Sequence, residues 1–237
     1  MRPRLFTAYH YATLGGLCSG IVTIQLFCAP AKSSGAQSMS AQIALLALGA
    51  NMEGPFGGPV KTFVHAIQML GDAGVQVQAA SAVYLTDPVG PGWQSPYHNA
   101  VVRASWSRGP TALLRLAKRI ERACGRRPGP VWGPRVLDID VIHHGARIVG
   151  WPVNGRWSHG LTLPHRRAAA RAFVIIPLAA VSPGWRHPVT GARACDLARR
   201  MRGRKGRIRE VVASSLPVSA EAIAASASAR CRAGGRS

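Results

Sequence analysis

The stretch Val131–Ile142 reads V-W-G-P-R-V-L-D-I-D-V-I, and the rest of the sequence is best interpreted outward from it. Its second half alternates apolar and acidic residues, a pattern typical of a β-strand with two different faces. Asp138 and Asp140 are two residues apart, so a strand would project both carboxylates to the same side. The opposite face would then point into a core and carry Leu137, Ile139 and Val141.

Two neighbouring carboxylates repel each other unless a positive charge lies close to both. Carboxylate oxygens with room for water and phosphate are ligands that Mg²⁺ prefers. Upstream, Gly133-Pro134 predicts a turn, and Arg135 supplies a fixed positive charge suited to phosphate oxygens. A strand with a solvent-exposed polar face would also explain the two aspartates. With W-G-P-R directly before them, we favour a site for Mg²⁺ and a nucleotide.

The flanking sequence predicts an α+β fold with the element order β-α-β-β-α-β. Strands are expected at Ile43–Leu48, Val75–Leu85, Asn99–Trp106 and around Asp138–Val141, and helices are expected to begin at Pro59 and Pro110. This order is that of a ferredoxin-like core, with two helices on one face of an antiparallel sheet. Additional C-terminal elements include an apolar segment, Phe173–Val181, and a basic one, Arg199–Arg209.

The chain has 237 residues, with 30 Lys and Arg against nine Asp and Glu, and a formal net charge of +21. Such a charge attracts nucleic acid, anionic membranes or phosphate-rich ligands. The basic residues are spread along the chain and aromatic residues make up only 6%, so we interpret the charge as compositional. Five cysteines without a C-x-x-C pair argue against a disulfide framework or a zinc site and fit a reducing compartment.

Three segments are expected: an N-terminal extension (1–40), one domain (41–210) and a disordered tail (211–237). The extension has a basic start, an apolar middle (Leu14–Phe27) and the sequence Ala29-Pro30-Ala31. These features resemble a secretory signal, and the segment is also long enough to span a bilayer. A third interpretation is that translation begins at Met39 and the extension has no role. All three stay open, and we favour the third.

Six fragments, in order along the chain, resemble the motifs of one enzyme family. They are A-L-G-A-N (47–51), Y-L-T-D-P-V-G (84–90), Y-H-N-A-V-V (97–102), R-I-E-R-A-C-G-R (119–126), W-G-P-R-V-L-D-I-D (132–140) and L-P-H-R-R-A-A-A-R-A-F-V (163–174). Each fragment alone is a weak signal, but all of them in this order are specific. The chain resembles the 6-hydroxymethyl-7,8-dihydropterin pyrophosphokinases of folate synthesis, from about residue 43 to residue 185.

The resemblance implies transfer of the β,γ-pyrophosphoryl group of ATP to the pterin hydroxymethyl group, with release of AMP. It implies that Asp138 and Asp140 hold two Mg²⁺ ions and that Arg126 and Arg135 assist from a loop that closes over ATP. Positioning and electrostatics would then carry the rate. Further contacts with ATP are expected from Glu121, Trp132, Val141, Thr162, His165 and Arg171.

A pterin is a flat heterocycle with a donor–acceptor edge, so it needs aromatic faces and a matched amide. The resemblance assigns the faces to Tyr97 and Phe173 and the edge to Asn99. Backbone groups complete the edge, and they are expected from Thr86, Pro88 and Val89. Taken alone, Phe173 would be expected in the core and Asn99 at a strand end. The pair His143-His144 matches no motif, and we interpret it as a solvated strand end and not as a metal site.

Ala50, Pro128, Val131 and Gly160 differ from residues common in the family, and these differences concern closure over ATP. Two other classes remain open: a basic ferredoxin-like nucleic-acid-binding domain without catalysis, and an inactive exported relative. Because ATP and dihydropterin are cytosolic metabolites, we expect a cytoplasmic enzyme. Its expected partners are the two small-molecule substrates and neighbouring folate-pathway enzymes, without nucleic acid or membrane.

Overall fold

The computed structural model describes residues 40–88, 94–129, 133–152, 156–157, 160–202, 208–212 and 216. All of them belong to one compact unit, Met39–Ser237. The expected N-terminal extension lies outside the described residues apart from Ser40, so the three interpretations of it stay predictions. Val89 and Trp132, two of the expected site residues, also lie outside them.

A six-stranded antiparallel sheet lies at the centre of the described unit, in the order β5-β1-β4-β3-β6, with β2 also paired to β4. The elements are β1 (Gln42–Ala50), α1 (Pro59–Asp72), β2 (Gln76–Ala80), β3 (Val83–Thr86), β4 (Tyr97–Trp106), α2 (Pro110–Ala123), β5 (Asp138–His144), η1 (Ala168–Ala170), α3 (Ala172–Val181), α4 (Ala194–Arg202) and β6 (Ile208–Val212). The predicted ferredoxin-like order is confirmed, with β2 and β3 in the place of one predicted strand.

The predicted strand Val75–Leu85 is divided in two at Ser81. The Ser81 amide donates to the Val101 carbonyl at 2.9 Å, while the Val101 amide donates to the Ser81 hydroxyl oxygen at 3.0 Å. A side-chain oxygen therefore replaces one backbone acceptor of the ladder. Both β2 and β3 still pair with β4, on either side of this point.

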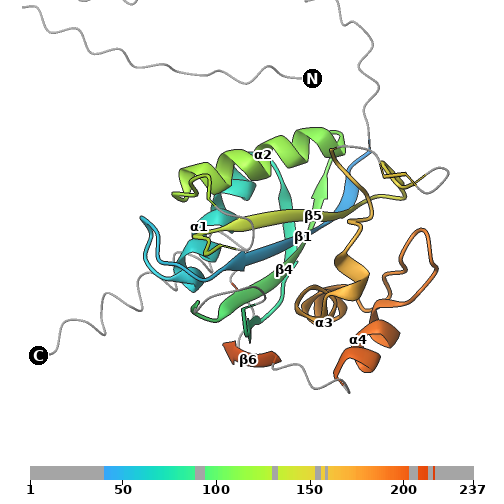
Figure 1. Cartoon of the computed structure of the whole chain (residues 1–237). Coiled ribbons are helices and arrows are strands. Elements are labelled where there is room, and N and C mark those ends of the chain that lie inside the picture. Colours follow the sequence, from blue (N-terminus) through green and yellow to red (C-terminus); the bar gives the residue numbers. More distant parts are fainter. Residues whose placement is uncertain are drawn as a thin grey trace, which may run out of the picture. The chain divides into compact units, whose positions relative to one another are not determined.

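The two faces of the sheet have different covers (Figure 1). Helices α1 and α2, which begin at Pro59 and Pro110 as predicted, pack on the face that carries Leu46, Leu48 and Ile139. The predicted apolar segment forms helix α3, which packs with α4 on the opposite face. Helix α3 is buried along most of its length, because it lies between the sheet and α4.

The C-terminal part differs from expectation at the start of the tail. Val211 and Val212 belong to β6, which pairs with β3, although disorder was expected from residue 211. Leu216 is buried, and its amide donates to the Ser81 carbonyl at 3.4 Å. Strand β6 therefore extends the sheet, and Leu216 extends the core. The Ala- and Ser-rich composition of the tail did not indicate either feature.

The interpretation of His143-His144 as a solvated strand end was wrong. His144 is fully buried, and the His143 ring lies edge-on to Trp185 at 5.9 Å between centroids. Burial, with smaller contributions from His144 and His187, lowers the pKa of His143 to about 4. The layer of α3 and the following loop covers this end of β5, which could not be seen from the strand alone. In the part of the chain that the structure describes, no three His, Cys, Asp or Glu side chains gather as a metal site.

None of the helices among the described residues has the length and apolar character needed to cross a lipid bilayer.

Candidate active site

A cavity of about 530 Å³ lies on the sheet face that carries α3, where the helix leaves the ends of β1, β4 and β5 uncovered. This volume is typical of small-molecule sites. Asp138 and Asp140 both line it, as the strand alternation predicts. The other expected site residues in its wall are Thr86, Tyr97, Asn99, Arg135, Arg171 and Phe173.

Asp138 is held by cations from helix α2 and the segment after it. Arg126 Nη1 forms a short ion pair with Asp138 Oδ1, and Lys118 Nζ lies 3.7 Å from the same oxygen. Burial alone would raise the pKa of Asp138, but the charges of Arg126 and Lys118 hold it below its usual range. Asp138 is therefore ionised at neutral pH.

Asp140 has a different set of partners. Arg171 Nη1 lies 3.7 Å from Asp140 Oδ2, and His165 Nε2 lies 3.9 Å from the same oxygen. Each aspartate thus has its own cationic or polar neighbours, from opposite sides of β5. This separation offsets the repulsion that two carboxylates on one strand face would otherwise suffer.

His165 is neutral in this arrangement. Burial lowers its pKa, and the nearby arginines Arg171 and Arg166 lower it as well, against the opposing effect of Asp140. Its Nδ1 accepts from the Arg167 amide at 3.3 Å, which leaves the proton on Nε2. His165 therefore offers an uncharged hydrogen-bond donor on the Asp140 side of the cavity.

Glu121 lies beneath Asp138 and is only 2% exposed. Its carboxylate accepts from Lys118 Nζ at 2.6 Å and from the Ile139 amide at 2.7 Å, and it pairs with Arg126 Nη1 at 2.8 Å. Burial raises the pKa of Glu121, while Lys118 and the Ile139 amide oppose that shift. Glu121 therefore fixes the two cations that face Asp138.

The segment Gly133–Arg135 is tied to two strands. The Arg135 amide donates to Asn51 Oδ1 at 2.7 Å, and the Arg135 carbonyl accepts from the Asn51 amide at 2.9 Å. The Tyr97 hydroxyl donates to the Gly133 carbonyl at 2.9 Å, and burial raises the pKa of Tyr97. These bonds connect β1 and β4 to the turn that places Arg135 in the cavity wall.

Asn99 is buried at the floor of the cavity on β4. Its Nδ2 donates to Thr86 Oγ1 at 3.0 Å and to the Tyr97 carbonyl at 3.1 Å, so both amide hydrogens have protein acceptors. The carbonyl oxygen of this amide is the group left for a ligand. On the opposite wall, the Arg171 guanidinium carbon lies 5.5 Å from the centre of the Phe173 ring.

This cavity occurs in a chain with clear relatives. A sequence profile of the 7,8-dihydro-6-hydroxymethylpterin-pyrophosphokinase family matches residues 45–183. The chain belongs to this family. The assignment confirms the family predicted from the six motifs, and it does not favour a nucleic-acid-binding domain.

Named relatives agree with the family. A 2-amino-4-hydroxy-6-hydroxymethyldihydropteridine pyrophosphokinase of Methylorubrum extorquens is 37% identical over 142 residues, covering 59% of this chain and 82% of the relative. The protein of that name from Mycobacterium bovis is 44% identical over 126 residues, covering 52% and 65%. The mitochondrial folate synthesis bifunctional protein of Arabidopsis thaliana is 33% identical over 171 residues, but this chain covers only 29% of it and 70% of itself.

Solved structures agree in fold. The Plasmodium falciparum HPPK-DHPS crystal structure superposes with a TM-score of 0.55 at 14% identity, covering 70% of this chain and 46% of that chain. At this identity the likeness concerns the fold alone.

The remaining described residues that were expected at the site do not line the cavity. Arg126, Glu121 and His165 are joined by ion pair or close approach to Asp138, Asp140 or their partners. Val141 points to the other face of β5 and packs in the core with α2. Pro88 and Thr162 are outside the cavity wall, although Pro88 adjoins Asp87, which lines it.

Two residues of the pyrophosphokinase site were missed by the sequence analysis. Lys118 was not expected, although its position three residues before Glu121 on a predicted helix places the two side chains together. Asn51 was quoted in the motif A-L-G-A-N without a role, because its contact with Arg135 joins segments 84 residues apart.

The two aspartates fit a magnesium–nucleotide site. Their side chains are 31% and 33% exposed, so both carboxylates reach the cavity. Mg²⁺ is usually held by one or two carboxylates together with substrate phosphates and water. Two carboxylates that face one cavity leave coordination positions for phosphate oxygens and water, so the donor set suits an ion that arrives with a nucleotide.

Proposed function

We propose that this chain transfers the β,γ-pyrophosphoryl group of ATP to the hydroxymethyl group of 6-hydroxymethyl-7,8-dihydropterin, with release of AMP. One observation carries the proposal. Asp138 and Asp140 line one cavity together with Asn99 and Phe173, so that metal-binding groups and a recognition surface for a flat heterocycle adjoin. Family membership supplies the reaction class.

In the proposed reaction, the pterin hydroxymethyl oxygen forms a bond to the β-phosphorus of ATP. The bond between that phosphorus and the oxygen shared with the α-phosphate breaks, and AMP leaves with the electron pair. The hydroxyl proton is lost to a nearby base, and Asp140 is the ionisable group placed to accept it. The chain's main contribution is to hold the two reactants in line and to neutralise charge.

The side chains that can donate hydrogen bonds to phosphate divide between the two halves of the site. Arg126 and Lys118 lie on the Asp138 side, and Arg171 and His165 on the Asp140 side. We assign all four groups to phosphate oxygens, with Arg135 from the turn above them. Asp138 and Asp140 would hold two Mg²⁺ ions, which, when bound, screen the phosphate charge and polarise the attacked phosphorus.

Pterin recognition is assigned to the other end of the cavity. Asn99 Oδ1 would accept a hydrogen bond from a ring N–H, since both hydrogens of its amide are already used within the protein. Tyr97 and Phe173 would contact the ring faces, and Thr86 orients the Asn99 amide. We further propose a neighbouring folate-pathway enzyme as partner, because the Arabidopsis relative is named a folate synthesis bifunctional protein. We also propose a cytoplasmic location, because ATP and the dihydropterin are cytosolic metabolites.

The test is AMP release from ATP, measured with and without the hydroxymethyl pterin and with Mg²⁺. Pterin-dependent AMP release is expected. Asp140→Ala should lower the rate by about 10³-fold or more, because metal charge stabilisation is worth several kcal/mol. The fold should survive, since Asp140 is partly exposed. Asp196→Ala, which changes an aspartate of α4 outside the cavity, is the matched control and should keep the wild-type rate. AMP release that ignores the pterin would contradict the proposal.

A further inference from the structure

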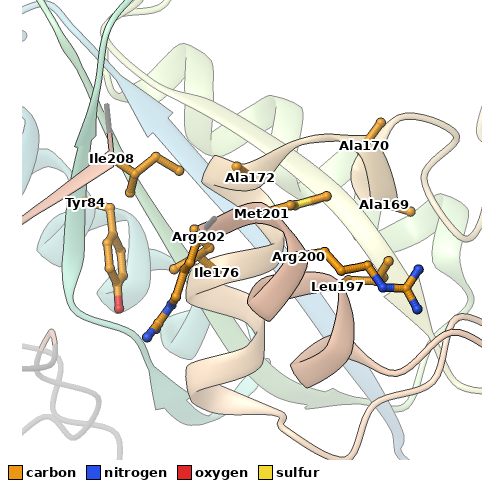
Figure 2. Close-up of a pocket in the computed structure, with 10 residues that line it drawn as sticks. All are labelled: Tyr84, Ala169, Ala170, Ala172, Ile176, Leu197, Arg200, Met201, Arg202 and Ile208. Atoms are coloured by element: carbon orange, nitrogen blue, oxygen red, sulfur yellow. The ribbon is translucent and has the colours of Figure 1, made fainter. Parts of the chain in front are cut away.

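A second cavity of about 590 Å³ lies on the far side of α3 from the nucleotide-binding aspartates (Figure 2). It is open to solvent and is lined by residues of η1, α3, α4, β3 and β6. Its apolar side chains include Ile176 from α3, Leu197 and Met201 from α4, and Ile208 from β6. No step of the proposed reaction uses this space.

The same cavity has a positive rim. Arg200 and Arg202, in the last turn of α4, line it, and none of the described side chains that line it is acidic. Neither arginine has an ion-pair or hydrogen-bond partner among the described residues. Arg199 on the same turn differs, because it pairs with Asp196 at 3.4 Å and does not line the cavity. In Figure 2, Arg202 extends on the side of Tyr84.

The two cavities share a thin wall. Ala170 and Ala172 line both, whereas the intervening Arg171 and the following Phe173 line only the active-site cavity. The first turn of α3 therefore has one surface on each cavity. A molecule in the second cavity would contact the backbone segment that positions a phosphate-binding arginine and a pterin-contacting ring.

We propose that the second cavity binds a small amphipathic organic anion, with an apolar body against Ile176, Met201 and Ile208 and an anionic group at Arg202. Its volume is that of a small-molecule site. An inorganic phosphate would leave the apolar side chains without contacts, and an uncharged ligand would form no charge-assisted hydrogen bond with Arg202. Through Ala170 and Ala172, the occupant alters pterin affinity at the active site. This second statement rests on the proposed function; the first does not.

The binding site is tested with 1-anilinonaphthalene-8-sulfonate, an aromatic sulfonate that becomes fluorescent in apolar surroundings. Titration of the full chain should give saturable binding of one probe molecule. Arg202→Gln should weaken probe affinity about tenfold, the usual worth of a hydrogen bond to a charged group. Arg199→Gln, on the same turn but outside the cavity, should change affinity less than about twofold. Circular dichroism and a cooperative thermal transition check that each variant is folded.

Several outcomes would overturn the binding site. They are non-saturable fluorescence, equal probe affinity in the wild type and Arg202→Gln, and equal weakening by Arg199→Gln. The double variant Arg200→Gln/Arg202→Gln guards against compensation between the two arginines, and it should weaken binding further. Probe binding of the expected kind, together with no AMP release, would reject the proposed reaction but leave this site in place.

Coupling to the active site is tested by calorimetry. Pterin affinity is measured with and without saturating probe, and probe affinity with and without saturating pterin. The two affinities should shift by the same factor, about fivefold or more, because linkage between two sites is reciprocal. Arg202-dependent probe binding without any shift in pterin affinity would overturn the coupling. Complete displacement of the probe by pterin, unaffected by Arg202→Gln, would place the probe in the active site and overturn the proposal.

Discussion

Glu121 is a buried carboxylate that orders the cations around Asp138 without lining the cavity itself. It is 2% exposed, and it orients Lys118 and Arg126 toward Asp138 while accepting a hydrogen bond from the Ile139 amide. The cations offset the cost of burying its charge. The same two cations hold Asp138 ionised, so Glu121 influences the cavity through its neighbours.

Replacing Glu121 by Gln should lower the free energy of unfolding by about 2–4 kcal/mol. The change keeps the size of the side chain but leaves Asp138, which is partly exposed, as the remaining charged partner of Lys118 and Arg126. Urea denaturation at pH 7 measures the loss. Asp196→Asn is the matched control, because its partner Arg199 is 79% exposed, and an exposed pair contributes less than about 1 kcal/mol. A similar small loss for both variants would show that Glu121 is dispensable.

Replacing Phe173 by Ala should weaken binding of the pterin more than binding of ATP. The ring lines the cavity and lies over Arg171, and an aromatic contact adds about 0.5–1.5 kcal/mol beyond the apolar area it buries. We expect a loss of about tenfold in pterin affinity and less than threefold in ATP affinity, measured by calorimetry. Phe173→Leu keeps apolar contact and should lie between the two. Equal losses for both ligands would contradict the assignment.

For single residues, the sequence predicted those whose positions follow from the alternation of side chains along a strand or from a motif. Asp138 and Asp140 share a face because strands alternate, and both line the cavity. The contact between Asn51 and Arg135 could not be predicted, because it depends on how two loops meet after folding. The use of both Asn99 hydrogens by Thr86 and Tyr97 likewise depends on strand register.

The C-terminal end of strand β5 has neighbours that the sequence did not predict. His143 there packs against Trp185, in the segment between α3 and α4, and burial with two nearby histidines lowers its pKa to about 4. An unfolded chain protonates this histidine near its usual pKa of about 6.5. The folded state therefore resists protonation between these two values.

This histidine should make the protein less stable as pH falls. The folded pKa is below the unfolded one, so its contribution is fully present above about pH 6.5 and is lost as pH falls toward 4. His143→Phe keeps an aromatic ring against Trp185 but cannot titrate. The unfolding free energy of the wild type minus that of this variant should fall by about 2–3 kcal/mol between pH 7 and pH 4.5. A pH-independent difference in urea melts would contradict this.

The boundaries of elements could be predicted where a proline marks the start of a helix. They could not be predicted where contacts between distant parts of the chain determine them. Pro59 and Pro110 begin α1 and α2 as expected. The division of the second strand at Ser81 depends on a hydroxyl that meets the Val101 amide across the sheet. The segment Phe173–Val181 is apolar throughout, so no period could distinguish a helix from a strand.

At the scale of the whole domain, the two faces of the sheet differ in what they carry: one is a closed apolar core, and the other contains a cavity. The face under α1 and α2 is closed and apolar, and it carries Leu46, Leu48 and Ile139. The face under α3 and α4 is divided between a second apolar cluster and the active-site cavity. The sequence predicted the first face from the element order. It could not predict the second, because α3 and α4 lie outside the βαββαβ pattern.

A chain that begins at Met39 should fold and react like the full chain. Every buried residue that the structure describes lies at or after Ala44, and the first strand begins at Gln42. Its melting temperature should lie within about 2 °C of that of the full chain, because the truncation keeps every residue of the described core and should change the free energy of unfolding by less than about 0.5 kcal/mol. Pterin-dependent AMP release should agree within about twofold. A loss of either property would give residues 1–38 a part in the domain.

The amide of Ile139 and the carbonyl of Ile142 have a consequence for association between molecules. Strand β5 is the last in the sheet order, with β1 on one side only. On the other side the Ile139 amide is taken by Glu121, and the Ile142 carbonyl accepts from the His165 amide at 2.9 Å. Exposed strand margins invite cross-molecule pairing and fibrous aggregates. Two outward backbone groups of β5 are therefore bonded within the molecule, by α2 and by the loop after β5, and a strand of a second molecule could pair along this margin only by breaking these bonds.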